Sequence, residues 1–322
     1  MKLATCMSNG TPTLGVVDTQ HQTILDIQRA HIALHGRADP AFASMLDLIK
    51  SGDAGLQCAR EVVAASRVRK LETQALSSVC LLAPLPRPTQ IRDFSVFPHH
   101  IEYGAKRLRA IQQGDPTRFD ESIDGFPSIY REAPVFYFSN RMNVAGTDST
   151  LAWPAGESLL DFELELAACI GQTGKDIARA EARAHIFGYT IFNDVSARLA
   201  QARQVPAGLG PCKGKSHDGC NVLGPWIVTP DELPDPYNLS VSVRVNGELW
   251  HESATRGMLH CFEDMIAFAS AGETLHAGEV LGSGTVDGCC SLEIGRWVRP
   301  GDVVELGIEG IGTLRTQYGQ GG

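Results

Sequence analysis

Beyond residue 90, apolar and polar positions alternate in short runs separated by turn residues, which is the pattern of β-strands. These runs occupy residues 135–143, 159–171, 187–196, 221–230, 239–250 and 302–314. Helical spacing of apolar residues occurs over 100–112, 176–187 and 259–271. Strands outnumber helices without a regular alternation of the two, which argues against a doubly wound parallel sheet. An Asn-Gly pair at 246–247, between two alternating runs, predicts a β-hairpin.

The chain before residue 90 has a different pattern. Residues 11–28 are typical of two short strands joined by a polar turn at 18–22, and residues 41–68 of two helices broken at 51–53. Three prolines within residues 81–90 then predict a linker. We therefore expect a small N-terminal domain over 1–88 and a larger, β-rich domain over 89–322.

Composition excludes several classes of protein. The 322 residues include 28 Lys+Arg and 37 Asp+Glu, a formal net charge of -9, and nucleic-acid binders usually show a basic face instead. No apolar run approaches the roughly 20 residues that span a bilayer, and no apolar segment follows the N-terminus as in a signal peptide. The nine cysteines form no CxxC pair, which favours reduced thiols and a cytoplasmic protein. We expect no nucleic acid and no membrane among its partners.

Acidic residues alternate with apolar ones at Asp161, Glu163 and Glu165. On a strand these three carboxylates share one face, where they repel each other unless a cation neutralises them. The alternative is the solvated face of an edge strand. Asp194 ends a strongly apolar run, and a buried acid needs a partner, which a metal ion shared with Glu163 and Glu165 would supply. Ligands that are all carboxylates favour Mg²⁺, then Mn²⁺ or Ca²⁺.

Three other segments carry candidate chemistry. Asp93 is followed within seven residues by His99 and His100, and the turn-rich stretch 283–293 ends in an acid. Taken singly, each is also compatible with a surface turn. His31 and His35 have the i, i+4 spacing of a metal pair on a helix, but no third ligand is near in the sequence, so we expect a solvated helix face.

Together these segments resemble the fumarylacetoacetate hydrolase family over residues 90–315. The motifs are LLDFELELAACIG (159–171), GYTIFNDVSAR (188–198), GLGPCKGKS (208–216) and SGT…SLE (283–293). The second motif departs from the family pattern at Val195, where Trp is usual, and is followed by Leu199, where an acid is usual. The resemblance implies an α+β, predominantly β fold: a small N-terminal α/β domain, then a mixed β-sandwich roll that carries catalysis, in a homodimer.

The family's site residues can be placed on this sequence one by one. Glu163 and Glu165 fall on its ExE metal ligands, Asp194 on the acid of the NDxSAR motif, and Asp93 on a further ligand of the fumarylacetoacetate-cleaving branch. The resemblance thus implies a divalent-metal site built from four carboxylates.

The resemblance also implies a catalytic pair. The histidine of the fumarylacetoacetate-cleaving branch falls on His100 and its partner acid on Glu293, while His99 with Glu102 resembles the HxxE of the acylpyruvate-cleaving branch and is the alternative. The remaining matches are oxyanion and substrate positions at Arg198, Gln201 and Lys215, a substrate-facing tyrosine at Tyr137 and a carboxylate contact at Thr285.

The activity that follows is hydrolysis of a carbon–carbon bond in a β-diketo acid, of the fumarylacetoacetate or acylpyruvate type, by water that the His–Glu pair activates. Two alternatives use the same fold. One is a decarboxylase, hydratase or isomerase of a related 2-oxo acid at the same metal site, and the other is a metal-binding protein without catalysis.

Overall fold

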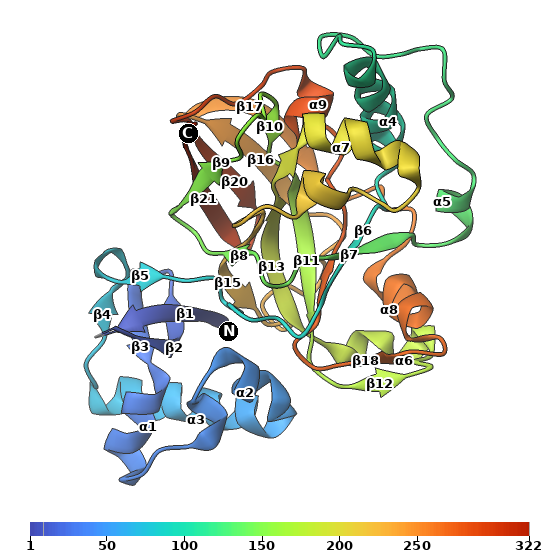
Figure 1. Ribbon diagram of the computed structural model, residues 1–322. Helices are drawn as coiled ribbons and strands as arrows, with labels where there is room; N and C mark the ends of the chain where they lie inside the picture. Colours follow the sequence, from blue (N-terminus) through green and yellow to red (C-terminus); the bar gives the residue numbers. More distant parts are fainter. Residues whose placement is uncertain (9, 322) are drawn as a thin grey trace.

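The computed structural model describes residues 1–8 and 10–321. Its N-terminal part is an antiparallel sheet with helices packed on one side (Figure 1). The strands are β1 (Lys2–Ser8), β2 (Thr11–Asp18), β3 (Thr23–Asp26), β4 (Gln74–Ala75) and β5 (Cys80–Leu81). The helices are α1 (Ile27–His35), η1 (Pro40–Phe42), α2 (Met45–Lys50), α3 (Gly52–Arg69) and η2 (Leu76–Ser78). The predicted strand pair and the predicted break between two helices are both confirmed.

The N-terminal sheet is continuous with the sheet of the larger part. Strand β1 pairs antiparallel with β15 (Asn221–Val228), through Lys2 opposite Val228 and Leu3 opposite Ile227. A shared apolar core crosses the same junction, since Leu3 belongs to one cluster with Phe187 and Ile227. The domain boundary near residue 88 stays a prediction, because the chain passes from one part to the other there while the sheet and the apolar core are shared by both parts.

Two packed sheets form the larger part. One continues from β15 through β13 (Ile186–Asp194), β11 (Leu164–Ile170), β19 (Val280–Gly282), β6 (Ile91–Phe94) and β7 (Phe136–Ser139), with β8 (Val144–Ala145) beside β15. The other has the order β17 (Glu248–Ala254), β16 (Ser240–Val245), β20 (Val303–Ile308), β21 (Gly312–Gly321) and β9 (Ser149–Trp153). Strands β11, β13 and β15 are buried at every position. The predicted α+β, predominantly β fold with a mixed sandwich is confirmed.

Helices gather at one end of the sandwich, where α4 (Pro98–Gln112), α7 (Arg198–Gln204) and α9 (Ser291–Ile294) lie together (Figure 1). The other helices are α5 (Ile129–Glu132), α6 (Arg179–Ala182), α8 (Phe262–Ser270), η3 (Arg183–His185), η4 (Val205–Ala207) and η5 (Cys212–Lys215). Two-residue strands complete the described elements: β10 (Leu160–Asp161) with β14 (Ser196–Ala197), and β12 (Gly174–Lys175) with β18 (Thr274–Leu275). Within residues 1–8 and 10–321, none of the helices has the length and apolar character to cross a membrane.

Some expectations about single segments were wrong. The helix expected over 176–187 is reduced to α6 and the 3₁₀ turn η3, because Ile186 already pairs with Ile170 and starts β13. The histidine pair of α1 is not a solvated face. His31 is only 6% exposed, and its Nδ1 is 2.9 Å from the carbonyl oxygen of Arg37, while His35 is exposed.

The predicted hairpin and the thiols were correct. Asn246 and Gly247 both have positive φ, 52° and 80°, as a two-residue type I′ turn requires, and they connect β16 to β17. All nine cysteines are free thiols.

Candidate active site

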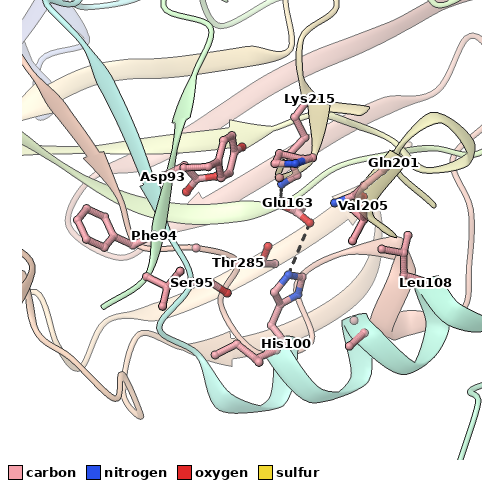
Figure 2. A pocket seen from close by; sticks show the side chains of 18 of the residues that line it. Asp93, Phe94, Ser95, His100, Leu108, Glu163, Gln201, Val205, Lys215 and Thr285 are labelled. Atoms are coloured by element: carbon pink, nitrogen blue, oxygen red, sulfur yellow. Dashed lines mark hydrogen bonds and ion pairs between the residues drawn. The ribbon is translucent and has the colours of Figure 1, made fainter. Parts of the chain in front are cut away.

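A pocket of about 380 Å³ opens between α4, α7 and the strand ends of β6 and β11. Figure 2 shows charged side chains from several elements pointing into it. Of the predicted site residues, those that line the pocket are Asp93, His100, Tyr137, Glu163, Glu165, Arg198, Gln201, Lys215 and Thr285. The other two, Asp194 and Glu293, lie directly behind it, in contact with Tyr137 and His100. The structure therefore brings all eleven together.

Three carboxylates from strands of one sheet converge, and each has an oxygen without a hydrogen-bond partner. Asp93 on β6, Glu165 on β11 and Asp194 on β13 are buried, and one oxygen of each lies within 4.8 Å of the others. Asp93 Oδ1, Glu165 Oε1 and Asp194 Oδ1 accept no hydrogen bond. Burial and the surrounding negative charges raise the pKa of both Glu165 and Asp194 well above their ordinary values. Orphaned, buried carboxylate oxygens are the donor set that a hard divalent cation needs.

Glu163 stands beside this triad and is neutralised by two cations. Its Oε1 accepts from Arg198 Nη2 and its Oε2 from Lys215 Nζ, which also contacts Asp194. Burial opposes ionisation of Glu163, but the charges of Lys215 and Arg198 outweigh it and lower its pKa. The part of Glu163 as a metal ligand stays a prediction.

Asp161 has a role that the sequence did not reveal. It accepts from Arg198 Nε at 2.8 Å and from the backbone N–H groups of Ser291 and Leu292 at 2.7 and 3.1 Å. One buried carboxylate therefore fixes both the Arg198 guanidinium and the start of α9, the helix that carries Glu293. The alternating acids were the signal, and Arg198 Nη2 contacts both Asp161 and Glu163 although β10 and β11 are separate strands. All three acids are buried, and the solvated edge strand is excluded.

The predicted catalytic pair is formed. His100 Nδ1 lies 2.8 Å from Glu293 Oε2. Its Nε2 lies 3.7 Å from Glu163 Oε1, a contact that Figure 2 marks with a dashed line. Burial opposes ionisation of Glu293, but the positive charge and hydrogen bond of His100, with a second bond from His99, lower its pKa to about 2. The ionised carboxylate accepts from Nδ1–H, which leaves the lone pair of Nε2 free on the pocket side.

Glu293 also holds a second histidine. Its Oε1 is 2.7 Å from Nδ1 of His99, whose side chain is 48% exposed and stacks on Tyr103 at 4.2 Å. His99 does not pair with Glu102, which binds Lys106 instead at 2.8 Å. The alternative pair of the acylpyruvate-cleaving branch is therefore absent here.

The remaining predicted residues surround the same space. Tyr137 donates to Asp194 Oδ2 at 2.8 Å, and Gln201 Oε1 accepts from Arg198 Nη1 at 2.8 Å. The Thr285 hydroxyl is buried without a hydrogen-bond partner, so it is available to a ligand. The departures from the family motif, Val195 and Leu199, are absent from the pocket lining.

The turn that carries Thr285 depends on a glycine. Gly284 has φ +79°, and its N–H donates to Glu165 Oε2 at 3.0 Å. A Cβ at this position would lie 2.5 Å from the carbonyl oxygen of Phe94. Only glycine therefore lets this turn approach the acidic cluster.

The family model described as Fumarylacetoacetate (FAA) hydrolase C-terminal matches residues 113–318, more than half of the chain, and the chain belongs to this family. Oxaloacetate tautomerase YisK of Bacillus subtilis is 30% identical over 326 residues, covering 99% of this chain and all of that protein. The mitochondrial oxaloacetate tautomerase Fahd2a of Rattus norvegicus is 31% identical over 283 residues, covering 86% and 80%. The maleylpyruvate hydrolase of Sphingobium sp. SYK-6, solved with manganese(II) and pyruvate, is 26% identical with a TM-score of 0.72 over both full chains. The family is enzymatic and includes hydrolases, isomerases and tautomerases.

Proposed function

We propose that this chain is a divalent-metal-dependent hydrolase that cleaves a carbon–carbon bond in a β-diketo acid. The observation that carries the proposal is the His100–Glu293 pair, which presents a free imidazole nitrogen to a pocket beside a cluster of orphaned carboxylates. A carboxylate-backed imidazole beside a cation site is suited to activating water for hydrolysis, and the same imidazole would serve as the base of an isomerase.

Asp93, Glu165 and Asp194 would hold the cation, with Glu163 at their side, and Mg²⁺, Mn²⁺ or Ca²⁺ suits such oxygen ligands. When bound, it would act as a Lewis acid toward the oxygens of the 2-oxo acid. The relative solved with manganese and pyruvate supports both the ion class and the 2-oxo acid.

His100 acts as the base. Nε2 removes a proton from water, whose oxygen attacks the carbonyl carbon distal to the 2-oxo acid. The bond between that carbon and the CH₂ group breaks, and its electron pair leaves with the CH₂ carbon as an enolate. The imidazolium then returns the proton to this carbon, so the products are a carboxylic acid and a 2-oxo acid. Glu293 holds the Nδ1–H in place and stabilises the imidazolium.

Charged and polar side chains stabilise the oxyanion that forms during attack. Lys215, Arg198 and the amide of Gln201 lie on the side of Glu163, and the unpartnered Thr285 hydroxyl is free to donate to the substrate carboxylate. Tyr137 orients Asp194 by donating to it.

The test is turnover of a small panel of acylpyruvates and fumarylacetoacetate by the purified protein with Mg²⁺ or Mn²⁺. We expect the ultraviolet band of the diketone to disappear and the two acids to form in equal amounts. A protein that leaves every diketone intact, or that changes only its enol content, contradicts the proposal.

Tautomerisation of a 2-oxo acid is the second candidate, because an oxaloacetate tautomerase matches the chain from end to end. His100 would then move a proton between carbon and oxygen without water attack. If the protein speeds the decay of the enol form of a 2-oxo acid and no product acids appear, this reaction is favoured.

A further inference from the structure

The pocket has an apolar half that the proposed chemistry does not use. His100, Gly104 and Leu108 follow each other at four-residue spacing, so one face of α4 runs from the base into the pocket, with Ala105 beside it. Val205 also lines this half (Figure 2). In Figure 2, Leu108 and Val205 lie near Gln201, and Phe94 lies on the opposite side.

Among the residues that line the pocket, the lysine and arginine side chains are already neutralised. Arg198 is bonded to Asp161 and Glu163, and Lys215 to Glu163 and Asp194. Both cations lie on the Glu163 side of the pocket, so neither pairs with a second carboxylate in the apolar half, where a charge buried without a partner is costly. The part of the ligand that lies in this half is therefore uncharged.

Gly104 keeps this half open at the expense of the helix. Glycine in a helix interior destabilises the helix relative to alanine. A Cβ at Gly104 would lie 3.5 Å from Leu292 Cδ2 and 3.6 Å from His100 Cε1, so a methyl group fits there but a larger side chain would extend into the pocket. The missing side chain leaves space next to the base.

We propose that Gly104, Ala105, Leu108 and Val205 form an apolar subsite that binds the acyl group of the substrate, and that Gly104 sets how bulky this group can be. The inference rests on the proposed function and narrows its substrate class to 2,4-dioxo acids with an alkyl or aryl acyl group. A dicarboxylate would place its second carboxylate against these apolar walls.

Hydrolysis of a matched substrate series tests this class. The substituent on the acyl carbonyl is methyl, butyl, phenyl, or a chain of the butyl length that ends in a carboxylate. We expect kcat/KM to rise about three- to fourfold for each CH₂ group buried, and the carboxylate substrate to be at least about tenfold poorer than the butyl one. Equal or better turnover of the carboxylate substrate overturns the subsite.

Two variants address the residues themselves. Leu108→Arg adds a cation to the subsite and should reverse the preference in favour of the carboxylate substrate. Gly104→Leu should retain the methyl substrate and lose the phenyl one. Ile32→Arg, which makes the same charge change on the exposed face of α1, is the control and should leave the preference unchanged. If Leu108→Arg keeps the original order of preference among the substrates, the subsite is wrong. Gly104→Ala adds only one methyl group to a helix that should become more stable, so it checks the role of Gly104 without a loss of folding.

Binding separates this inference from the proposed function. N-substituted oxamates mimic a 2-oxo acid and carry the same alkyl, phenyl or carboxyalkyl groups, so calorimetry with Mn²⁺ measures the subsite without turnover. Tighter binding of the phenyl compound in a protein that hydrolyses no diketone would retain the subsite and reject the hydrolase. Diketone hydrolysis by a protein that binds all the oxamates equally would retain the hydrolase and reject the subsite. A protein that binds no oxamate at all would also overturn the subsite.

Discussion

Glu293 binds two imidazoles at once, one through each oxygen, yet only His100 lines the pocket. Sequence spacing could not decide between two adjacent histidines, whereas the direction of α4 places one inside and the other half exposed. At the scale of single residues, the same substitution at His100 and at His99 therefore compares a histidine inside the pocket with one outside it.

His100→Ala should lower kcat by about 10²–10⁴, the usual contribution of general-base catalysis, with divalent-ion affinity nearly intact. Glu293→Gln acts through the same step, so the double variant should lose little beyond the poorer single variant. His99→Ala should be mild by comparison. Steady-state kinetics and ion titration check these effects, and an inactive His99→Ala beside an active His100→Ala would refute the assignment.

The acid limb of the pH profile should move with Glu293. Burial opposes the charged imidazole, but the negative charge of Glu293, its hydrogen bond and the charge of Glu163 raise the pKa of His100 above its ordinary value. Only neutral imidazole accepts a proton, so kcat/KM should fall as the pH drops through a pKa above 6.5. Glu293→Gln removes the charge that favours imidazolium, and the limb should shift to lower pH by about one unit or more. An unchanged limb would show that another group controls it.

Glu165 is the clearest test of the cation site, because no lysine or arginine pairs with it. Glu165→Gln should weaken binding of Mg²⁺ or Mn²⁺ by about 100-fold or more, since one anionic ligand is lost. In chelator the same variant should raise the melting temperature, because it removes repulsion among Asp93, Glu165 and Asp194. Glu72→Gln, at an exposed acid, is the control. Calorimetry that finds unchanged ion affinity would place the site elsewhere.

At the scale of elements, the order of strands in one sheet explains why the acids meet. The path β13, β11, β19, β6 puts Asp194, Glu165 and Asp93 on strands that lie within one sheet, and the parallel pairing of β19 with β6 sets Gly282 opposite Asp93. A Cβ at Gly282 would lie 2.6 Å from Glu165 Oε2 and 2.7 Å from Asp93 Oδ1. The glycine of the short strand β19 thus leaves the space in which carboxylates from both sides converge.

The β16–β17 hairpin isolates a backbone effect. Gly247 has φ +80°, and a Cβ there meets nothing within 4 Å, so Gly247→Val should cost about 1–2 kcal/mol of unfolding free energy through the backbone alone. Gly247→Asn, which places at the same position a residue that tolerates positive φ, should stay within about 0.5 kcal/mol of the unchanged protein. Chemical denaturation measures both, and equal stabilities for the two variants would contradict the turn argument.

At the scale of the molecule, the terminal strand β7 pairs only with β6 among the described strands. Phe138 on β7 and Met142 just beyond it are exposed, which is typical of a surface that another chain covers. We expect a homodimer, measured by light scattering at micromolar concentration. Met142→Asp should weaken it, whereas Val68→Asp on α3 should not, although these side chains are similarly exposed, at 76% and 84%. A monomeric unchanged protein would contradict this expectation.

Much of the fold was predictable because it depends on local pattern. Alternation identified most long strands, the Asn246-Gly247 turn identified the hairpin, and helical spacing identified α4 and α8. The prediction failed at 176–187, where pairing of Ile186 with Ile170 outweighs a helical pattern. It also failed at His31, which is buried against Phe42 of η1, a contact that the spacing of the two histidines does not reveal.

For the candidate site, the sequence by itself determined which residue types are present and, through spacings that match a family, which of them to examine. Only the tertiary structure decided which role each carboxylate has. Asp161 fixes Arg198 and the start of α9, and Glu163 pairs with two cations. Asp93, Glu165 and Asp194 each keep an oxygen without a hydrogen-bond partner. The physical reason is that a carboxylate's role follows from its burial and the charge beside it. Both are set by strands and helices that are far apart along the chain.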